Sequence, residues 1–220
     1  MGVNMSKRLD LIQRYNASDR LNHWFVAITF ILLALSGLAL FHPAFFFLTG
    51  LLGGGPWTRI LHPFIGIAMF AGFVGMMVRF WNDNQITEND RKWISQVGDV
   101  INNREENLPP VGRYNAGQKY LFWTMVACIS LLLITGVLIW QPYFAPYVPI
   151  VAVRLAVLVH ALAAFIIIAG IMVHIYAAIW VKGSVRAMTR GTVTDAWARQ
   201  HHLAWYREIK NKGSHGHDHY

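Results

Sequence analysis

The sequence predicts an all-α integral membrane protein, a four-helix bundle with both termini on the same side. The chain has 220 residues, of which 55% are hydrophobic and 14% are charged. The apolar residues gather in four long runs, each matching or exceeding the roughly 20 residues that cross a bilayer. Helices are favoured over strands because unpaired backbone groups are costly in lipid. The expected spans are 21–41, 60–81, 120–140 and 151–181, within a single transmembrane domain covering 1–220.

The first half of the chain divides at turn-forming residues. The N-terminal segment 1–20 is polar, and we expect a short amphipathic segment on the cytoplasmic surface. The first span ends just before Pro43. The apolar stretch Phe45–Leu52 is too short to cross the membrane and is expected at the interface. Glycines and Pro56 then form an external turn before the second span.

The second half contains a polar loop, two more spans and a polar tail. The loop 82–118 is rich in charge, and we expect a short helix around Trp93–Ile101. A short aromatic connection, Pro142–Pro149, suits the membrane interface. Within the tail 182–220, the stretch 183–209 has helical spacing of apolar residues, which predicts a docking surface for a partner protein. That surface comprises Val185, Met188, Trp197 and Trp205, and the His-rich end Gly213–Tyr220 is expected to be disordered.

The positive charges indicate the orientation in the membrane. The formal net charge is +8, and the basic residues lie mostly in 1–20, 79–119 and 182–212. The first and third loops carry few, with Arg59 and Arg154 at helix starts. The positive-inside rule therefore puts both termini and the second loop in the cytoplasm. An even number of spans also places both termini on one side of the membrane, in agreement with this orientation. This distribution explains the charge without nucleic-acid binding.

A single cysteine, Cys128, lies in the middle of the third span. One cysteine cannot form an internal disulfide or hold an iron–sulfur cluster, which needs several thiolates. The absence of a Cys-x-x-Cys-His motif excludes covalent c-type haem attachment. Cys128 is therefore expected to be a packing residue.

Four histidines lie inside the apolar runs: His23, His62, His160 and His174. His160 and His174 are 14 residues apart, which places them within about 40° on one helix face and roughly 21 Å apart along the axis. The alternating direction of the spans sorts the four by depth into an outer pair, His62 with His160, and an inner pair, His23 with His174. Imidazole is a common haem ligand, and ionisable groups in a bilayer are functional candidates. The pattern predicts two bis-histidine b haems that carry electrons.

Other residues support this interpretation less specifically. Gly37, Gly66, Ala164 and Gly170 lie on the histidine-bearing faces and would leave flat space for a porphyrin, although small residues also serve helix packing. Arg59, Arg79 and Arg154 either pair with haem propionates or anchor helix ends at the interface. His42 has no partner at its depth and is expected to be interfacial.

Five strings of the sequence carry a family resemblance over residues 15–210. The chain resembles the cytochrome b (gamma) subunits of membrane-bound formate dehydrogenases of the N/O type. The strings are RILHPFIGIAMF (59–70), VGRYNAGQK (111–119), TGVLIWQPYFAPY (135–147), VHIYAAIWVKGS (173–184) and HHLAWYREI (201–209).

The resemblance implies four spans and two b haems, with His62 and His160 on the outer haem iron and His23 and His174 on the inner one. It also implies a menaquinone site at Asn115, Gly117 and Gln118 together with His174. Amide groups and a glycine N–H are suitable partners for a quinone carbonyl. Without the resemblance, the string NAGQ is interpreted as a helix-start loop with Asn115 as the N-cap.

The resemblance further implies partners and a location. An iron–sulfur (beta) subunit and a molybdenum or tungsten catalytic (alpha) subunit would oxidise formate and deliver electrons, with this multi-pass chain in the bacterial inner membrane. Members often form trimers of heterotrimers, so the resemblance is compatible with a higher oligomer of heterotrimers. The alternatives are a cytochrome b subunit of a hydrogenase or another molybdenum oxidoreductase, and a four-helix metal or proton transporter. The haem potentials, the physiological quinone and an aerobic or nitrate-linked role stay open.

Overall fold

The computed structural model describes residues 10–102, 104, 108–141 and 143–215. This part of the chain forms two compact units, which we treat separately. The membrane unit comprises Ser18–Phe80 and Leu121–Ala177. The polar unit comprises the described parts of Met1–Ala17, Trp81–Tyr120 and Ala178–Tyr220.

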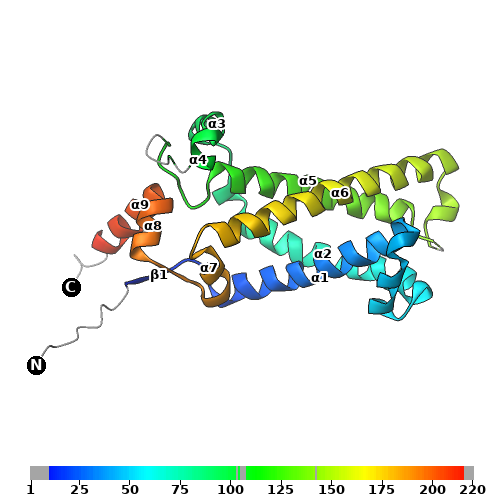
Figure 1. Ribbon diagram of the computed structural model, residues 1–220. Helices are drawn as coiled ribbons and strands as arrows, with labels where there is room; N and C mark the ends of the chain where they lie inside the picture. The colour runs from blue at the N-terminus through cyan, green and yellow to red at the C-terminus, as the bar shows by residue number, and fades with distance from the viewer. Residues whose placement is uncertain (1–9, 103, 105–107, 142, 216–220) are drawn as a thin grey trace, which may run out of the picture. The chain divides into compact units, whose positions relative to one another are not determined.

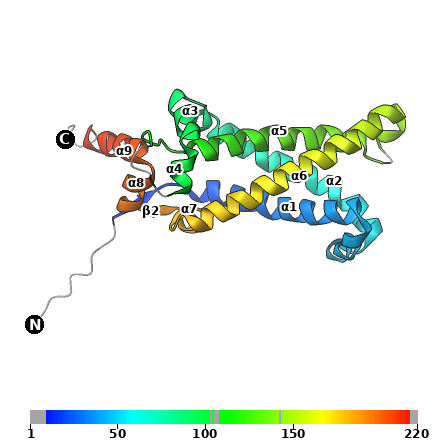
Figure 2. The same cartoon turned by 45° about the horizontal axis from the view of Figure 1, so that its top comes forward.

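Four long helices make up the membrane unit and confirm the predicted fold class. They are α1 (Ala17–Phe41), α2 (Gly55–Phe80), α5 (Ala116–Leu138) and α6 (Ile150–Trp180). The views of Figures 1 and 2 show their membrane segments running side by side. Each is long and apolar enough to cross a bilayer. The helices α1 and α2 begin four to five residues before the predicted spans, because helix formation continues into the polar flanks.

The loop between α1 and α2 is also helical. The predicted interfacial stretch forms η1 (Pro43–Leu52), a 3-10 helix that His42 caps by accepting a hydrogen bond from the Ala44 N–H. Gly53 and Gly54 follow with φ of 90° and 97°, a conformation that suits glycine. The buried Thr58 hydroxyl then donates to the Gly54 carbonyl at 2.9 Å. This loop therefore turns the chain tightly into α2.

The core of the membrane unit lies at the middle of the helices. Phe73 and Ile167 are each only 2% exposed, and Cys128 packs with them, as predicted for this residue. Many large apolar side chains of the same helices are exposed on the outer surface of the bundle. That distribution is expected for helices that face lipid on one side and each other on the opposite side.

A glycine brings α1 and α2 together. A side chain at Gly72 would lie 2.7 Å from the Phe25 ring, so only glycine fits here without rearrangement. The Asn22 amide also donates to the Gly72 carbonyl at 3.1 Å. Small residues commonly permit such close contacts in membrane bundles.

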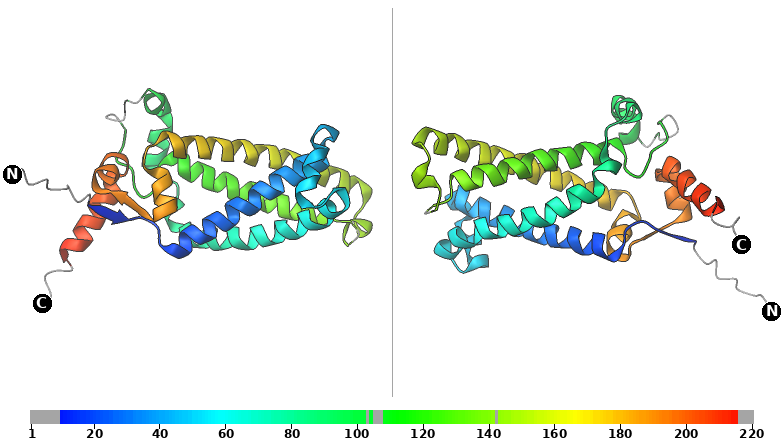
Figure 3. Two further views of the ribbon diagram at one scale, coloured as in Figure 1. Left: turned by 60° about the horizontal axis from the view of Figure 1, so that its bottom comes forward. Right: turned by 180° about the vertical axis from the view of Figure 1, so that it is seen from behind.

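The described part of the N-terminal segment contains a strand in place of the expected amphipathic segment, and residues 1–9 of that prediction lie outside the described residues. Strand β1 (Leu11–Gln13) pairs antiparallel with β2 (Thr192–Thr194), with Ile12 opposite Val193. Both views in Figure 3 show β1 beside the orange segment that carries β2. The prediction failed because three-residue strands that pair across most of the chain leave no local periodicity.

The loop between α2 and α5 forms η2 (Asn82–Asn84), α3 (Glu88–Ser95) and α4 (Val97–Ile101). The expected single helix at Trp93–Ile101 is thus two helices, of which the first starts earlier. Lys119 pairs with Asp90 at 2.8 Å, and both side chains are about nine-tenths buried. Partial burial raises the pKa of Asp90, but hydrogen bonds from Lys119 and Thr87 outweigh it and lower the pKa. The pair fixes the start of α5 against α3.

The tail forms α7 (Ser184–Arg190), β2, α8 (Asp195–His201) and α9 (Leu203–His215). Residues 213–215 of the end that was predicted to be disordered are the last turn of α9, and residues 216–220 lie outside the described residues. A short 3-10 helix, η4 (Ala145–Tyr147), joins α5 to α6 in the membrane unit.

Arg14, in the N-terminal segment, packs against Trp197 and Trp205, two of the four residues of the predicted docking surface, whereas Val185 is exposed and the prediction stays untested there. Arg14 is 5% exposed, and its guanidinium lies 4.8 Å from the Trp205 ring centre and 5.1 Å from that of Trp197. It donates to the Arg113 carbonyl at 2.6 Å and contacts Nε2 of His202 at 3.3 Å. The chain itself therefore covers the two tryptophans.

The His202 ring completes this cluster in its neutral form. Its Nδ1 lies 2.8 Å from the Gly112 carbonyl, so Nδ1 carries the proton and Nε2 accepts from Arg14. Burial first, and the charge of Arg14 second, lower the pKa of His202 from 6.5 to about 3, against the opposing effect of the Gly112 carbonyl.

Acid should therefore loosen the polar unit before it affects the membrane unit. Between pH 6.5 and about 3, unfolded His202 binds a proton that the folded unit excludes, so stability falls by up to about 1.4 kcal/mol per pH unit. The protection factors of the Ile12 and Val193 amides in the detergent-solubilised chain, which compare the exchange rate with that of an unfolded peptide at the same pH, should fall as the pH is lowered across this range. In a His202→Gln variant this loss of protection should largely vanish, and amides of α6 serve as the internal reference. Equal pH dependence in both proteins would contradict this role.

Candidate functional site

The structure brings the four intramembrane histidines together in the two pairs expected from their depth. His62 on α2 faces His160 on α6, with ring centres 6.5 Å apart and planes at 60°. His23 on α1 faces His174 on α6, with ring centres 6.4 Å apart and planes at 50°. The apolar core cluster, which includes Met69 of α2 and Ile167 of α6, lies at the middle of these helices.

The outer pair is held by two hydroxyl groups that were not predicted from the sequence. The Ser36 hydroxyl lies 2.8 Å from Nδ1 of His62, and the Thr135 hydroxyl lies 2.8 Å from Nδ1 of His160. Ser36 is on α1 and Thr135 on α5, so each hydroxyl reaches across from a neighbouring helix. Both are buried.

A cavity of about 420 Å³ lies beside the outer pair. Its walls include both histidines, the predicted small residues Gly37, Gly66 and Ala164, and also Gly136 and Arg59. A Cβ atom at Gly37 would lie 3.5 Å from Cε1 of His62, and one at Gly136 would lie 3.4 Å from Cε1 of His160. The glycines thus keep the space next to each ring open. Gly170 is not in this wall, and a Cβ atom there would lie 3.3 Å from the Leu121 side chain.

The inner pair lacks such hydroxyl partners among the residues described. Nδ1 of His23 is buried and has no hydrogen-bond partner in the described part of the chain. The His23 ring instead packs edge-on against Trp24, with ring centres 5.5 Å apart.

Both pairs fit a bis-histidine haem iron. An imidazole nitrogen binds a first-row metal at about 2.0 Å, and the ring centre lies about 1.1 Å beyond that nitrogen. Two imidazoles on opposite sides of one iron therefore have ring centres about 6.2 Å apart. The observed separations are 6.4 and 6.5 Å. The spacing of both pairs suits an iron porphyrin, and at the pair His62 and His160 the cavity and the open glycine surface suit its flat shape as well. Haem ligation by the four histidines stays a prediction.

Comparison with known proteins gives the family. Residues 14–191 match the model of the prokaryotic cytochrome b561 family. The chain belongs to that family. It is 48% identical over 204 residues to the formate dehydrogenase cytochrome b556(fdo) subunit of Escherichia coli K12, covering 93% of this chain and 96% of the relative. The nitrate-inducible cytochrome b556(Fdn) subunit of the same strain is 46% identical, covering 91% and 92%. A formate dehydrogenase cytochrome b556 subunit of Haemophilus influenzae is 42% identical, covering 90% and 83%.

Membership of the cytochrome b561 family confirms two expectations. The chain is a membrane cytochrome b, for which haem b is the implied cofactor. It is also a multi-pass protein of the bacterial inner membrane, in agreement with its four apolar helices. The resemblance to formate dehydrogenase cytochromes is confirmed by the level of identity to them.

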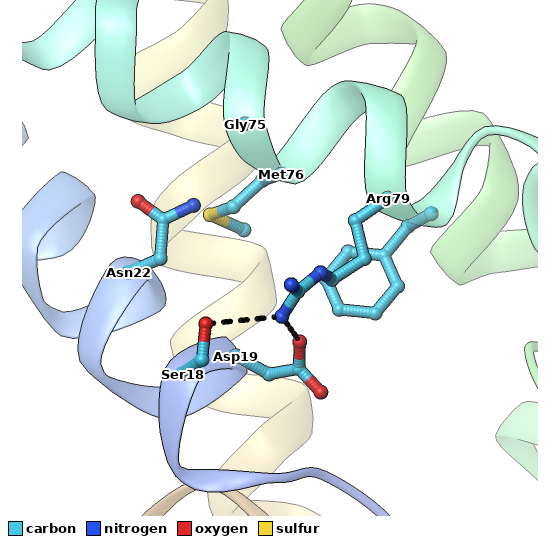
Figure 4. Close-up of a pocket in the computed structure, with 7 residues that line it drawn as sticks. Ser18, Asp19, Asn22, Gly75, Met76 and Arg79 are labelled. Carbon is cyan, nitrogen blue, oxygen red and sulfur yellow. Dashed lines mark hydrogen bonds and ion pairs between the residues drawn. The ribbon is translucent and has the colours of Figure 1, made fainter.

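The three arginines considered as propionate partners have different surroundings. Arg79 on α2 forms an ion pair with the buried Asp19 carboxylate of α1, and it donates to the Ser18 hydroxyl at 3.2 Å. Figure 4 shows both contacts on the wall of a cavity of about 140 Å³, next to Asn22 and Met76. Arg59 lines the outer cavity, whereas Arg154 is exposed. Arg59 is thus the arginine best placed to meet an anionic group at the outer site.

Three of the four residues expected at the quinone site lie at the start of α5, in the polar unit, whereas His174 belongs to α6 in the membrane unit. The Gln118 N–H donates to Oδ1 of Asn115 at 2.9 Å, and the Asn115 N–H donates to Oε1 of Gln118 at 3.0 Å. This reciprocal pair is a capping box, so the N-cap interpretation of Asn115 describes its local structure. Gly117 and Gln118 are exposed. Their contact with a quinone stays a prediction, as does that of His174.

One signal in the sequence does indicate the two hydroxyls. Ser36-Gly37 and Thr135-Gly136 are hydroxyl–glycine pairs in the outer halves of the first and third spans. The glycine opens space beside the histidine, and the preceding hydroxyl meets its second nitrogen. Only Gly37 of these four residues was predicted to belong to the site, because the pattern is visible only when both pairs are compared.

Filling the outer cavity should remove one haem. In Gly136→Leu, the new side chain would occupy the space next to His160, so we expect about half the wild-type haem per chain by the pyridine haemochrome assay. Gly50→Ala is the control, because a Cβ atom there meets nothing within 4 Å. Full haem content in Gly136→Leu would show that this cavity does not hold the outer group.

Proposed function

We propose that the chain is the membrane-anchoring dihaem cytochrome b subunit of a formate dehydrogenase complex, passing electrons from an outer-face iron–sulfur subunit through two haems to menaquinone on the cytoplasmic side. His62 and His160 would hold the outer iron, and His23 and His174 the inner iron. The two haems would supply one-electron carriers at two depths in the membrane. Formate oxidation would take place on a separate molybdenum or tungsten subunit.

The observation that carries the proposal is the repeated spacing of the paired imidazoles. Two pairs with ring centres 6.4 and 6.5 Å apart occur at two levels of one bundle. On α6, 14 residues separate His160 from His174, a rise of roughly 21 Å. Two ligands on each iron leave no position for oxygen, which favours electron transfer. A metal or proton transporter gives no reason for this repeated spacing.

The proposed direction of transfer would conserve energy. An electron that moves inward works against a membrane potential that is negative inside, at about 2.3 kcal/mol per 100 mV if it crosses fully. The charge distribution supports a cytoplasmic location for the start of α5, where protons for quinone reduction are available.

The capping box at the start of α5 is compatible with quinone binding. It uses the side-chain oxygens of Asn115 and Gln118 as acceptors. Each amide therefore keeps its NH₂ group, and a quinone carbonyl needs donors. The same side chains can stabilise the helix start and bind the quinone.

Purification of the native complex separates this proposal from its nearest alternatives. We expect an iron–sulfur subunit, a molybdenum or tungsten subunit and two b haems per copy of this chain. The identity of the relatives favours formate dehydrogenase over hydrogenase. Co-purification with a nickel-containing subunit would instead support the hydrogenase alternative, and a colourless preparation would support a transporter.

Single histidine variants test the ligand assignment. His160→Ala should remove the outer haem and leave the inner one, whereas His174→Ala should remove the inner haem and quinone reduction together. His42→Ala is the matched control, because His42 caps η1 and has no histidine partner among the described residues. Haem content per chain and menaquinone reduction by the purified complex are the measurements. Retention of two haems in both variants would refute the scheme.

A further inference from the structure

We propose that Ser36 and Thr135 are positioning residues that hold His62 and His160 in the iron-binding tautomer and lower the reduction potential of the outer haem site. This inference rests on the proposed function, because it requires an iron bound between these two histidines.

The backbone fixes the direction of the two hydrogen bonds. The Ser36 hydroxyl also lies 2.7 Å from the Leu32 carbonyl of its own helix, and the Thr135 hydroxyl lies 2.6 Å from that of Leu131. A hydroxyl has one proton, and a carbonyl can only accept. The hydroxyl proton therefore goes to the carbonyl, and the hydroxyl oxygen accepts from the imidazole.

This direction decides the tautomer of both rings. If Nδ1 carries the proton that each hydroxyl accepts, Nε2 has the free lone pair in His62 and in His160. A neutral imidazole binds metal through the nitrogen without the proton. Ser36 and Thr135 thus prepare Nε2 of both rings as the ligating atom before any metal is bound.

The same hydrogen bonds should affect the electronic properties of the iron. A ligand imidazole that donates its N–H to an oxygen becomes a more basic ligand. A more basic ligand stabilises the oxidised iron more than the reduced iron, so the reduction potential falls. One such hydrogen bond on each of the two histidine ligands would lower the reduction potential of the same iron, so the two effects add.

The effect is confined to the outer site. Nδ1 of His23 has no hydrogen-bond partner in the described chain, and no hydrogen bond of His174 is found there. The inner site therefore has no equivalent contribution. Removing the hydroxyls should shift one of the two haem potentials and leave the other unchanged.

The test is a redox titration of the purified complex, followed by haem absorbance. Ser36→Ala and Thr135→Val each remove a hydroxyl with little change in volume. We expect each to raise the potential of the haem that His160→Ala removes, and the double variant to raise it more than either single variant. The other potential should not move.

Matched variants separate an electronic effect from a structural one. Ser36→Thr and Thr135→Ser keep the hydroxyl and should therefore retain the wild-type potential. Ser36→Cys offers a weaker acceptor and should give a potential between those of the wild type and Ser36→Ala. Thr29→Val is the control on α1. The Thr29 hydroxyl donates to the Phe25 carbonyl at 2.7 Å, as Ser36 does to Leu32, but the described chain places no histidine at its other side. Both potentials should stay unchanged in Thr29→Val.

The outcomes distinguish this inference from the proposed function. A wild-type complex with fewer than two haems per chain refutes the proposed function before any titration. With two haems present, unchanged potentials in Ser36→Ala and Thr135→Val, or equal shifts at both haems, overturn the inference. If Ser36→Ala does not assemble, the Ser36→Thr and Ser36→Cys pair decides: equal potentials in these two proteins also overturn it.

Discussion

An imidazole inside a bilayer has two nitrogens to satisfy, and this requirement organises the membrane unit. A neutral ring offers one donor and one acceptor, and no water is present in the hydrocarbon to meet either. At the outer pair, hydroxyls from neighbouring helices meet Nδ1 of His62 and His160 at 2.8 Å. The remaining nitrogens require an electron-pair acceptor, which an iron would provide. The bundle therefore needs helices at fixed distances, because each ring takes its partners from different helices.

Small residues make those distances attainable. Gly72 allows α1 and α2 to approach, whereas Gly37 and Gly136 keep open space next to the outer rings. Gly72 therefore permits close packing of two helices, whereas Gly37 and Gly136 maintain a cavity. A small-residue pattern alone does not distinguish these uses, since each depends on what the neighbouring helix presents.

Features that follow from position along a helix could be predicted, whereas contacts between distant segments could not. The length of the apolar runs indicates the four spans, and their alternating direction indicates the depth pairing of the histidines. Ser36 and Thr135 escaped prediction because a hydroxyl in a membrane helix ordinarily bonds its own backbone, as Thr29 does. In the polar unit, the tail tryptophans have the spacing of a docking helix, yet Arg14 occupies their faces. Periodicity reveals that a face will be covered, but it does not reveal which part of the chain covers it.

The two histidine pairs differ in a way that composition alone does not indicate. Both have nearly the same ring separation, so both suit the same kind of metal ligation. Only at the outer pair does the described chain provide oxygen acceptors for the rings, whereas Nδ1 of His23 is left without one. Equal ligands in unequal hydrogen-bonding surroundings need not have equal affinity for an electron. A difference of this kind would give the path across the bundle a direction without any change in the ligand set.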